Sequence, residues 1–305
     1  TSGEWGHGIN ISECDRVRIE NVTVKNCWGD GIYIGSYDSE THETGCNNVT
    51  ISNCLIDNNR RNGISVVDCD NFIIDRCTIS NTNGTNPQCG IVIERNSDKQ
   101  ITSGTIKNTT FIDNYFHHIL QENSSNDNTI ENCIFKCKNN NSGGDIQSVD
   151  KKLIVINCLS NPSKRATLIV NGGNIDCFNH ITADSNTDNN SSYDSFIYSQ
   201  DGGTISARNC FATSHSTKWR GIYLNEGEVY VYNSILPTNR YHEKAAVISE
   251  CNPFELTVDY TFKAYEFPGD IVVPLSKSIT ITFNLAGLSP NTFTLYNKGS
   301  GQVTL

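Results

Sequence analysis

The chain repeats one short phrase at a nearly constant interval, and this repeat is the feature that most constrains its fold. A glycine followed by alternating apolar residues, first seen as Gly8-Ile9-Asn10-Ile11, returns along most of the chain. Strong copies begin at Gly31, Gly63, Gly90 and Gly221, and weaker copies centre on Ile119, Ile146, Leu168, Phe196 and Val247. Nine steps separate Ile9 from Val247, which gives a period of about 26 residues.

Two further phrases lie inside the repeat. An Asn-Cys pair follows a short apolar stretch, and we place its copies at Asn26-Cys27, Asn53-Cys54, Asn132-Cys133, Asn157-Cys158 and Asn209-Cys210. A Cys-Asp or Cys-Asn pair opens the next stretch, at Cys14-Asp15, Cys46-Asn47 and Cys69-Asp70. Each repeat therefore holds two or three short segments with alternating β-branched residues, and Gly, Asn and Asp turns separate them.

A unit of this length cannot bury its apolar face alone, so successive units must stack. Stacked coils place equivalent residues about 4.8 Å apart, and Asn tolerates the left-handed backbone that tight turns need. The sequence predicts an all-β fold, a right-handed parallel β-helix of about nine to ten coils. The domains expected are a β-helix over residues 1–252, with a truncated N-terminal coil, and a β-rich domain over 253–305 that caps the helix or forms trimers. Its strands are expected to be antiparallel.

The 13 cysteines fit this fold as small apolar residues of the core. Disulfide frameworks are typical of short secreted chains, and no cysteine spacing here matches a zinc site. We therefore expect free thiols and folding in a reducing cytoplasm, with disulfides between neighbouring coils as the alternative.

Charge and composition exclude several classes of function. A net charge of −10 argues against a nucleic-acid partner. No apolar run approaches the roughly 18 residues that span a bilayer, so membrane insertion is not expected. No dense acidic run predicts a metal site, so no cofactor is predicted and calcium stays open.

The first coils hold the residues that point most clearly to chemistry. His7 and Asp30 share one column of the stack, and Glu4 precedes them. These three are the catalytic candidates, because a carboxylate or an imidazole can move a proton. The substrate-binding candidates are aromatic, basic or part of a long loop over residues 36–43, namely Trp5, Trp28, Tyr33, Arg60, Arg61 and His42.

This combination suits an acidic sugar, because arginine pairs with carboxylates. Alternatively, Trp-Gly-x-Gly-Ile is a structural turn, Asp30 caps it, and the arginines are solvated. Scattered acidic residues at strand ends offer a second candidate groove in which no pair stands out, namely Glu94, Asp145, Asp194 and Glu226.

The coil pattern, with Trp28-Gly29-Asp30-Gly31-Ile32 at its clearest, resembles the pectin-lyase-like β-helix superfamily over about residues 4–250. Within it the chain is most similar to bacteriophage tailspikes and related polysaccharide depolymerases. Polygalacturonases of this superfamily carry Gly-Asp-Asp before Gly-His-Gly. Here Gly6-His7-Gly8 comes first and no Asp-Asp pair follows, which argues against that activity.

The resemblance implies a homotrimer of the virion tail, or another extracellular protein, that binds and depolymerises a bacterial surface polysaccharide by hydrolysis or β-elimination. Two alternatives stay open. One is a non-catalytic module that binds a glycan or receptor. The other is a secreted bacterial polysaccharide lyase, hydrolase or uronate epimerase.

Overall fold

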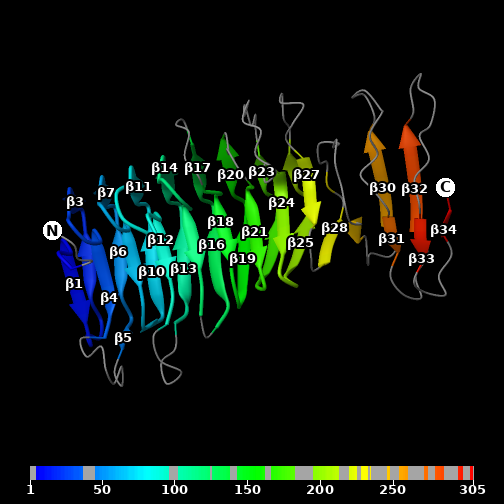
Figure 1. Ribbon diagram of the computed structural model, residues 1–305. Coiled ribbons are helices and arrows are strands. Elements are labelled where there is room, and N and C mark those ends of the chain that lie inside the picture. Colours follow the sequence, from blue (N-terminus) through cyan, green and yellow to red (C-terminus); the bar gives the residue numbers. More distant parts are fainter. Residues whose placement is uncertain are drawn as a thin grey trace.

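The structure is a computed structural model in which three long parallel sheets run side by side along a stack of coils (Figure 1). It describes residues 5–36, 45–95, 102–123, 126–137, 143–161, 166–182, 195–212, 220–224, 228–232, 234, 246–247, 254–259, 271–273, 279–284, 295–297 and 303–304.

The first sheet has nine strands and contains the repeated Gly-Ile phrase. Its strands are β1 (Ile9–Ser12), β4 (Ile32–Gly35), β8 (Ile64–Val66), β12 (Ile91–Ile93), β15 (Ile119–Gln121), β18 (Ile146–Ser148), β21 (Leu168–Asn171), β24 (Ser195–Gln200) and β27 (Arg220–Leu224). Each strand pairs with its counterpart one coil along the chain, so nine coils follow one another. The predicted right-handed parallel β-helix is confirmed.

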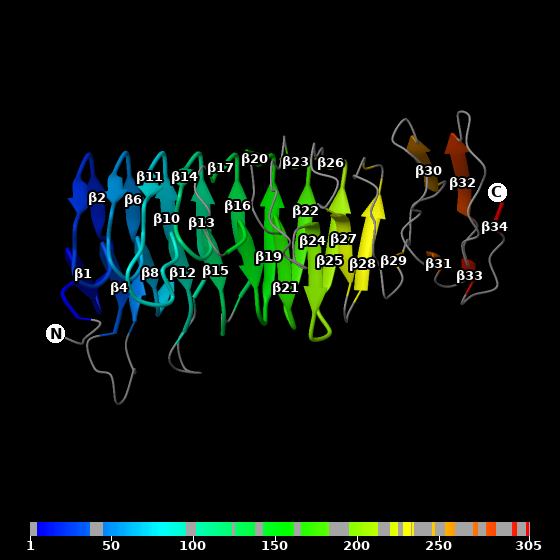
Figure 2. The same ribbon diagram turned by 45° about the horizontal axis from the view of Figure 1, so that its top comes forward.

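The other two long sheets complete each coil (Figure 2). The second sheet contains β2 (Arg18–Glu20), β6 (Thr50–Ser52), β10 (Phe72–Asp75), β13 (Gly104–Lys107), β16 (Asn128–Glu131), β19 (Lys152–Ile156), β22 (Asn174–Phe178), β25 (Thr204–Arg208) and β28 (Glu228–Tyr232). The third sheet contains β3 (Thr23–Lys25), β7 (Leu55–Asp57), β11 (Thr78–Ser80), β14 (Thr110–Ile112), β17 (Ile134–Lys136), β20 (Leu159–Asn161), β23 (Ile181–Thr182) and β26 (Phe211–Ala212). Two short strands, β5 (Cys46–Asn47) and β9 (Cys69–Asp70), pair beside them.

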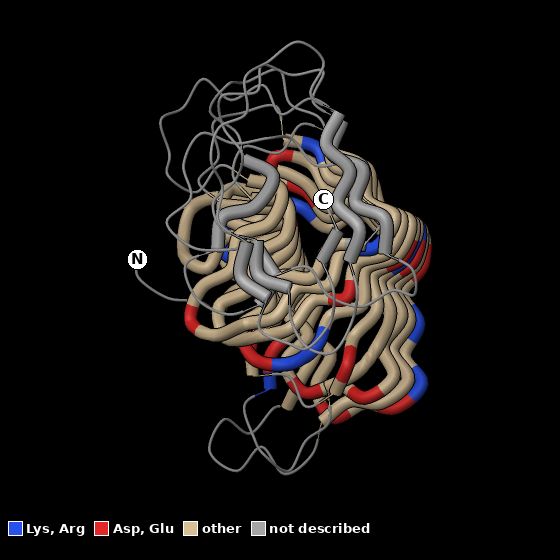
Figure 3. The backbone as a smooth tube through the Cα atoms, turned by 90° about the vertical axis from the view of Figure 1, so that its right-hand side faces the viewer, with Lys and Arg blue, Asp and Glu red and all other residues tan. Residues whose placement is uncertain are grey.

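The core is a continuous column of apolar side chains inside the coils. Inward-facing isoleucine, valine and phenylalanine side chains of all three sheets are buried, for example Ile64 of the first sheet, Ile74 of the second and Phe111 of the third. Phe111 and Phe135 stack with ring centroids 5.2 Å apart. In an end-on view the charged residues gather at the outer turns of the coils (Figure 3).

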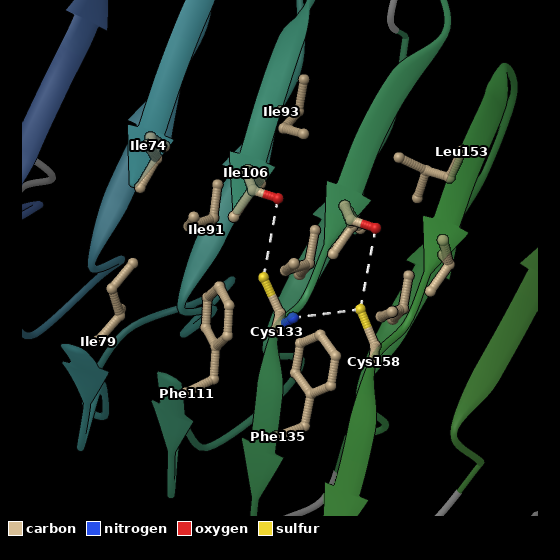
Figure 4. Close-up of a cluster of buried hydrophobic side chains, with 14 of the residues drawn as sticks. Ile74, Ile79, Ile91, Ile93, Ile106, Phe111, Cys133, Phe135, Leu153 and Cys158 are labelled. Carbon is tan, nitrogen blue, oxygen red and sulfur yellow. Dashed lines mark hydrogen bonds between the residues drawn. The ribbon is translucent and has the colours of Figure 1, made fainter. Parts of the chain in front are cut away.

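Cysteines fill the turn between the second and third sheets, as predicted. Cys133 and Cys158 occupy neighbouring coils, and the Cys133 N–H donates to Cys158 Sγ at 3.4 Å (Figure 4). All 12 cysteines of the described residues are free thiols. In this part of the chain the expected place of the cysteines in the core is confirmed, because ten of the 12 are buried.

The Asn-Cys phrase needs one correction. Asn53-Cys54 is aligned with Asn21-Val22, because Thr23 pairs with Leu55. Asn26-Cys27 therefore belongs to the following turn, where Asn58 Nδ2 donates to Asn26 Oδ1 at 2.7 Å. Both turns require a left-handed residue, with φ near 58° at Asn21 and 61° at Asn26, so both select asparagine and the sequence phrase alone cannot separate them.

Two other expectations differ from the structure. The eighth coil is aligned through Ile197, not Phe196, because Leu168 pairs with Ile197. Both Phe196 and Ile197 are buried, so no alternation marks the register.

The strands near the C-terminus pair in parallel, not antiparallel. They form two sheets, β29 (Ala246–Val247) with β31 (Ile271–Val273) and β33 (Leu295–Asn297), and β30 (Phe254–Asp259) with β32 (Ile279–Asn284) and β34 (Val303–Thr304). Equivalent residues recur at a spacing close to that of the coils, which explains why parallel pairing continues. The domain boundary at residue 252 stays a prediction.

The thiol core predicts a sharp division in reactivity. In the native protein a thiol reagent should modify exposed Cys14 quickly and half-buried Cys27 more slowly, because the other described cysteines are buried. The Cys14→Ser variant should lose the fast phase. Titration with Ellman's reagent, before and after unfolding without reductant, measures both. Fewer reactive thiols in the unfolded protein than the sequence holds would indicate disulfides and contradict the prediction.

Candidate functional site on the outer face of the first sheet

The stack brings residues from different coils together on the outer face of the first sheet. Ile32 and Ile34 of β4 point into the core, so Tyr33 between them points outward. Tyr33 pairs with Asn10 of β1 on one side and with Ser65 of β8 on the other. The turn just before these strands holds His7, Asp30 and Asn62 at equivalent positions.

Asp30 is the centre of a polar network and is fully buried. Its carboxylate accepts hydrogen bonds from Arg61 Nη1 at 3.1 Å, from the backbone N–H of Asn62 at 3.0 Å and from Ser65 Oγ at 2.9 Å. Burial raises the pKa of Asp30, while Arg61 and His7 act in the opposite direction. The carboxylate is thus held as the buried partner of Arg61 and Ser65.

His7 lies over this network with one nitrogen unused. Its Nδ1 accepts the backbone N–H of Asp30 at 3.2 Å, and its ring stacks on Tyr33 with centroids 5.0 Å apart. Burial lowers the pKa of His7, so the neutral ring with its proton on Nε2 fits this arrangement. The side chain is 8% exposed, and Nε2 has no hydrogen-bond partner among the described residues. A buried donor of this kind needs an acceptor, which a water molecule or a ligand can supply.

Two tryptophans mark the exposed edge of the same turn. Trp5 and Trp28 are aligned in neighbouring coils and are 73% and 46% exposed. Arg60 follows in the next coil, with its guanidinium 4.2 Å from the Trp28 ring centroid and its Nη1 donating to the Trp28 carbonyl at 3.3 Å. An exposed aromatic ring backed by a cation is a suitable platform for stacking a ligand.

Three acidic residues complete the face at the other end of these strands. Asp68 is fully buried, whereas Glu94 and Glu122 are half-buried. Burial and the neighbouring Glu122 raise the pKa of Glu94 to about 7, and Arg61 opposes this shift. Burial, Asp68 and Glu94 raise the pKa of Tyr33 to about 12. Glu94 is therefore a carboxyl group that can hold a proton near neutral pH.

The structure thus brings together most of the sequence-predicted residues. Asp30, His7, Tyr33 and Arg61 are in direct contact, and Arg60 stacks on Trp28. Glu4 and His42 lie outside the described residues, as does most of the 36–43 loop.

Of the predicted second groove, Glu94 lies on this face, whereas Asp145 is buried 3.7 Å from His118. Asp194 and Glu226 lie outside the described residues. Sequence reasoning missed Ser65, Asp68 and Glu122. The signal available for Glu122 was its position after Ile119, which matches that of Glu94 after Ile91.

In the described part of the chain, no group of three or more His, Cys, Asp or Glu is placed to hold a metal ion. Within the same residues, no helix is long and apolar enough to cross a membrane.

Comparison with known proteins agrees with the fold. Residues 6–135 match the family model described as a right handed beta helix region. The chain contains a right-handed β-helix. It is 31% identical over 145 residues to the uncharacterized protein YclG of Bacillus subtilis (strain 168), a match that covers 42% of the chain and 25% of YclG. It is 32% identical over 97 residues to the SPbeta prophage-derived uncharacterized protein YorA of the same strain, covering 30% of the chain and 17% of YorA. No solved structure matches the chain.

The Asp30–Arg61 pair predicts an unequal response to mutation. Arg61→Ala leaves a buried carboxylate without its cation and should lower the free energy of unfolding by about 3–5 kcal/mol. The Asp30→Asn/Arg61→Ala double variant should lose less, because no charge is then stranded. Urea unfolding of both variants tests this. Lys152→Ala, which removes the cation of the half-exposed Lys152–Asp176 pair, is a control that should have a small effect. A double variant less stable than Arg61→Ala would contradict the prediction.

Glu94 predicts a pH dependence of stability. Its pKa in the folded protein, about 7, lies above its ordinary value of 4.5, so the native state binds more protons between these values. The contribution of Glu94 is therefore fully present below about pH 4.5 and is lost as pH rises towards 7. Urea unfolding at several pH values should show a steeper fall for the wild type than for Glu94→Gln across this window. Parallel curves for the two proteins would refute the assignment.

Proposed function

We propose that the chain binds and cleaves a bacterial surface polysaccharide on the outer face of the first sheet, in the manner of a tailspike-type depolymerase. The β-helix fold fits proteins that bind or degrade polysaccharides. One observation carries the proposal: the exposed Trp28–Arg60 stack lies directly beside the buried network of Asp30, Arg61 and His7. A stacking platform next to a preorganised polar site suits an extended sugar chain.

The proposal gives these residues distinct roles. Trp5, Trp28 and Tyr33 contact sugar rings, and Arg60 holds the Trp28 ring in place. His7 donates from Nε2 to a sugar oxygen. Asp30, expected from the sequence to be an acid or base, is better suited to positioning Arg61 and Ser65, because its carboxylate is buried and accepts three hydrogen bonds. Glu4 stays a catalytic candidate.

A second candidate function is a non-catalytic glycan-binding module that uses the same face. The burial of Asp30 favours it, because the carboxylate singled out from the sequence then meets no substrate directly. The two candidates differ in one observable, which is whether a bound glycan is cut.

The setting of the protein also belongs to the proposal. We place it in a homotrimer of the virion tail or another extracellular assembly, without a required cofactor and with calcium open. Twelve free cysteines among the described residues support folding in a reducing cytoplasm before release. Sedimentation equilibrium measures the oligomer, and a monomer at micromolar concentration would contradict the trimer.

The test of function is release of reducing ends from a panel of purified capsular and cell-wall polysaccharides. The wild type should release oligosaccharides from one of them. Trp28→Ala should raise KM about tenfold, because it removes an aromatic stacking contact, and a comparable contact with a nucleobase contributes about 1–3 kcal/mol. Phe211→Ala, at an exposed aromatic ring of the third sheet, is the matched control.

Each outcome separates the candidates. Saturable binding to a polysaccharide without product would replace the depolymerase with the binding module. Neither binding nor release across the panel would overturn both.

A further inference from the structure

Glu94 and Glu122 occupy the same position in neighbouring coils. Each directly follows a strand of the first sheet, β12 or β15. The Glu94 N–H donates to the carbonyl of Val66 and the Glu122 N–H to that of Ile93, both at 2.9 Å. Coils in such a stack are about 4.8 Å apart. The two side chains therefore leave the sheet side by side, and both are half-buried, so a ligand on this face can reach them.

Different charged groups surround the two carboxyl groups and affect their pKa values. Glu94 is partly buried and faces Glu122, Asp30 and Asp68 as like charges and Arg61 as the opposite charge, and with a pKa of about 7 it is about half protonated at neutral pH. Glu122 faces Asp150 and Arg61, and burial also raises its pKa. The pKa values of both groups are raised, and a protonated carboxyl group beside an ionised one is the arrangement that acid and nucleophile require.

The charge of this face restricts the class of sugar that it can bind. Asp30 already engages Arg61, and Arg60 lies over Trp28. Against these, the face carries Asp30, Asp68, Glu94 and Glu122. A uronate would meet excess negative charge here, and β-elimination needs a cation opposite the uronate carboxylate. A neutral or amino-bearing sugar meets neither obstacle, so this charge balance argues against the acidic sugar expected from the arginines alone.

We infer that Glu94 and Glu122 are the catalytic pair of a retaining glycoside hydrolase that acts on a neutral or amino-sugar polysaccharide. The inference rests on the proposed function of this face. A separation of about 5 Å between carboxyl groups is typical of retention, and inversion needs roughly 6.5–9.5 Å. Residues one coil apart fit the shorter distance.

The reaction balances with these two groups and water. Glu94 gives its proton to the glycosidic oxygen as the C1–O bond breaks, and a Glu122 oxygen bonds to C1, which forms a glycosyl ester. Water then attacks C1, Glu94 takes the proton of that water, and the ester bond breaks to restore Glu122. No oxidant, metal or further reactant is needed.

A separate observation supports a ligand on the same face. The Nε2 of His7 is a nine-tenths buried donor without a partner among the described residues, and its ring stacks on Tyr33. Burial, Asp68 and Glu94 raise the pKa of Tyr33, so the charge of Glu94 is felt at this ring. A sugar chain lying from His7 towards Glu94 would supply the missing acceptor and bring a glycosidic bond to the pair.

The experiment uses the polysaccharide that the wild type cleaves in the panel. Glu94→Gln and Glu122→Gln should each lower kcat about 100-fold or more, whereas Glu131→Gln on the outer face of β16 should not. In the wild type, activity should fall as pH rises through about 7, where Glu94 loses its proton. The residual activity of Glu122→Gln should fall at a lower pH than the activity of the wild type, because the variant lacks the like charge that helps to raise the pKa of Glu94. NMR of the first-formed product reports the anomer.

The outcomes are distinct from those that test the proposed function. A wild type that cuts no glycan defeats the proposed function itself. If the wild type is active, a retained anomer with loss in both variants supports the pair, provided that circular dichroism shows both folded. An inverted anomer, or full activity in either folded variant, would overturn it. Cleavage confined to polyuronates would overturn the neutral substrate.

Discussion

Parallel hydrogen bonding between successive coils is the interaction on which the rest of this structure depends. Because each strand of the first sheet pairs with its counterpart one coil along, equivalent residues are held in columns about 4.8 Å apart. Inside the coils this spacing packs Phe111 on Phe135 and Cys133 against Cys158. A residue that suits one position therefore tends to suit the same position in the next coil, which is why the sequence repeats.

The same spacing creates chemistry on the outside. Like charges in one column repel, so a column of acidic residues is costly unless protons or cations are bound. The charge of Asp30 is compensated by an ion pair with Arg61 from the next coil. At Glu94, burial and the neighbouring Glu122 raise the pKa to about 7, so this carboxyl group retains a proton to higher pH than usual. Because the stack places acidic residues next to one another, it also shifts their pKa values.

The repeat made the coils, the thiol core and the alignment of His7 with Asp30 predictable, because each follows from a phrase with strong periodicity. It did not separate Asn21-Val22 from Asn26-Cys27, since both turns need asparagine in a left-handed conformation. Burial of Asp30 could not be predicted either, because it depends on contacts with Arg61 and Ser65 in the third dimension. Glu122 was missed because its coil carries a weak copy of the phrase, so the phase that aligns it with Glu94 is hard to see in the sequence.

The central claim is that the outer face of the first sheet, between Trp28 and Glu122, is where a sugar chain lies. A crystal structure of Glu94→Gln soaked with the oligosaccharide product tests this most directly. Sugar density is expected from Trp28 past Tyr33 to Glu94, with a ring on Trp28 and a sugar oxygen within hydrogen-bond distance of His7 Nε2. Density over the second or third sheet, with this face empty, would contradict it.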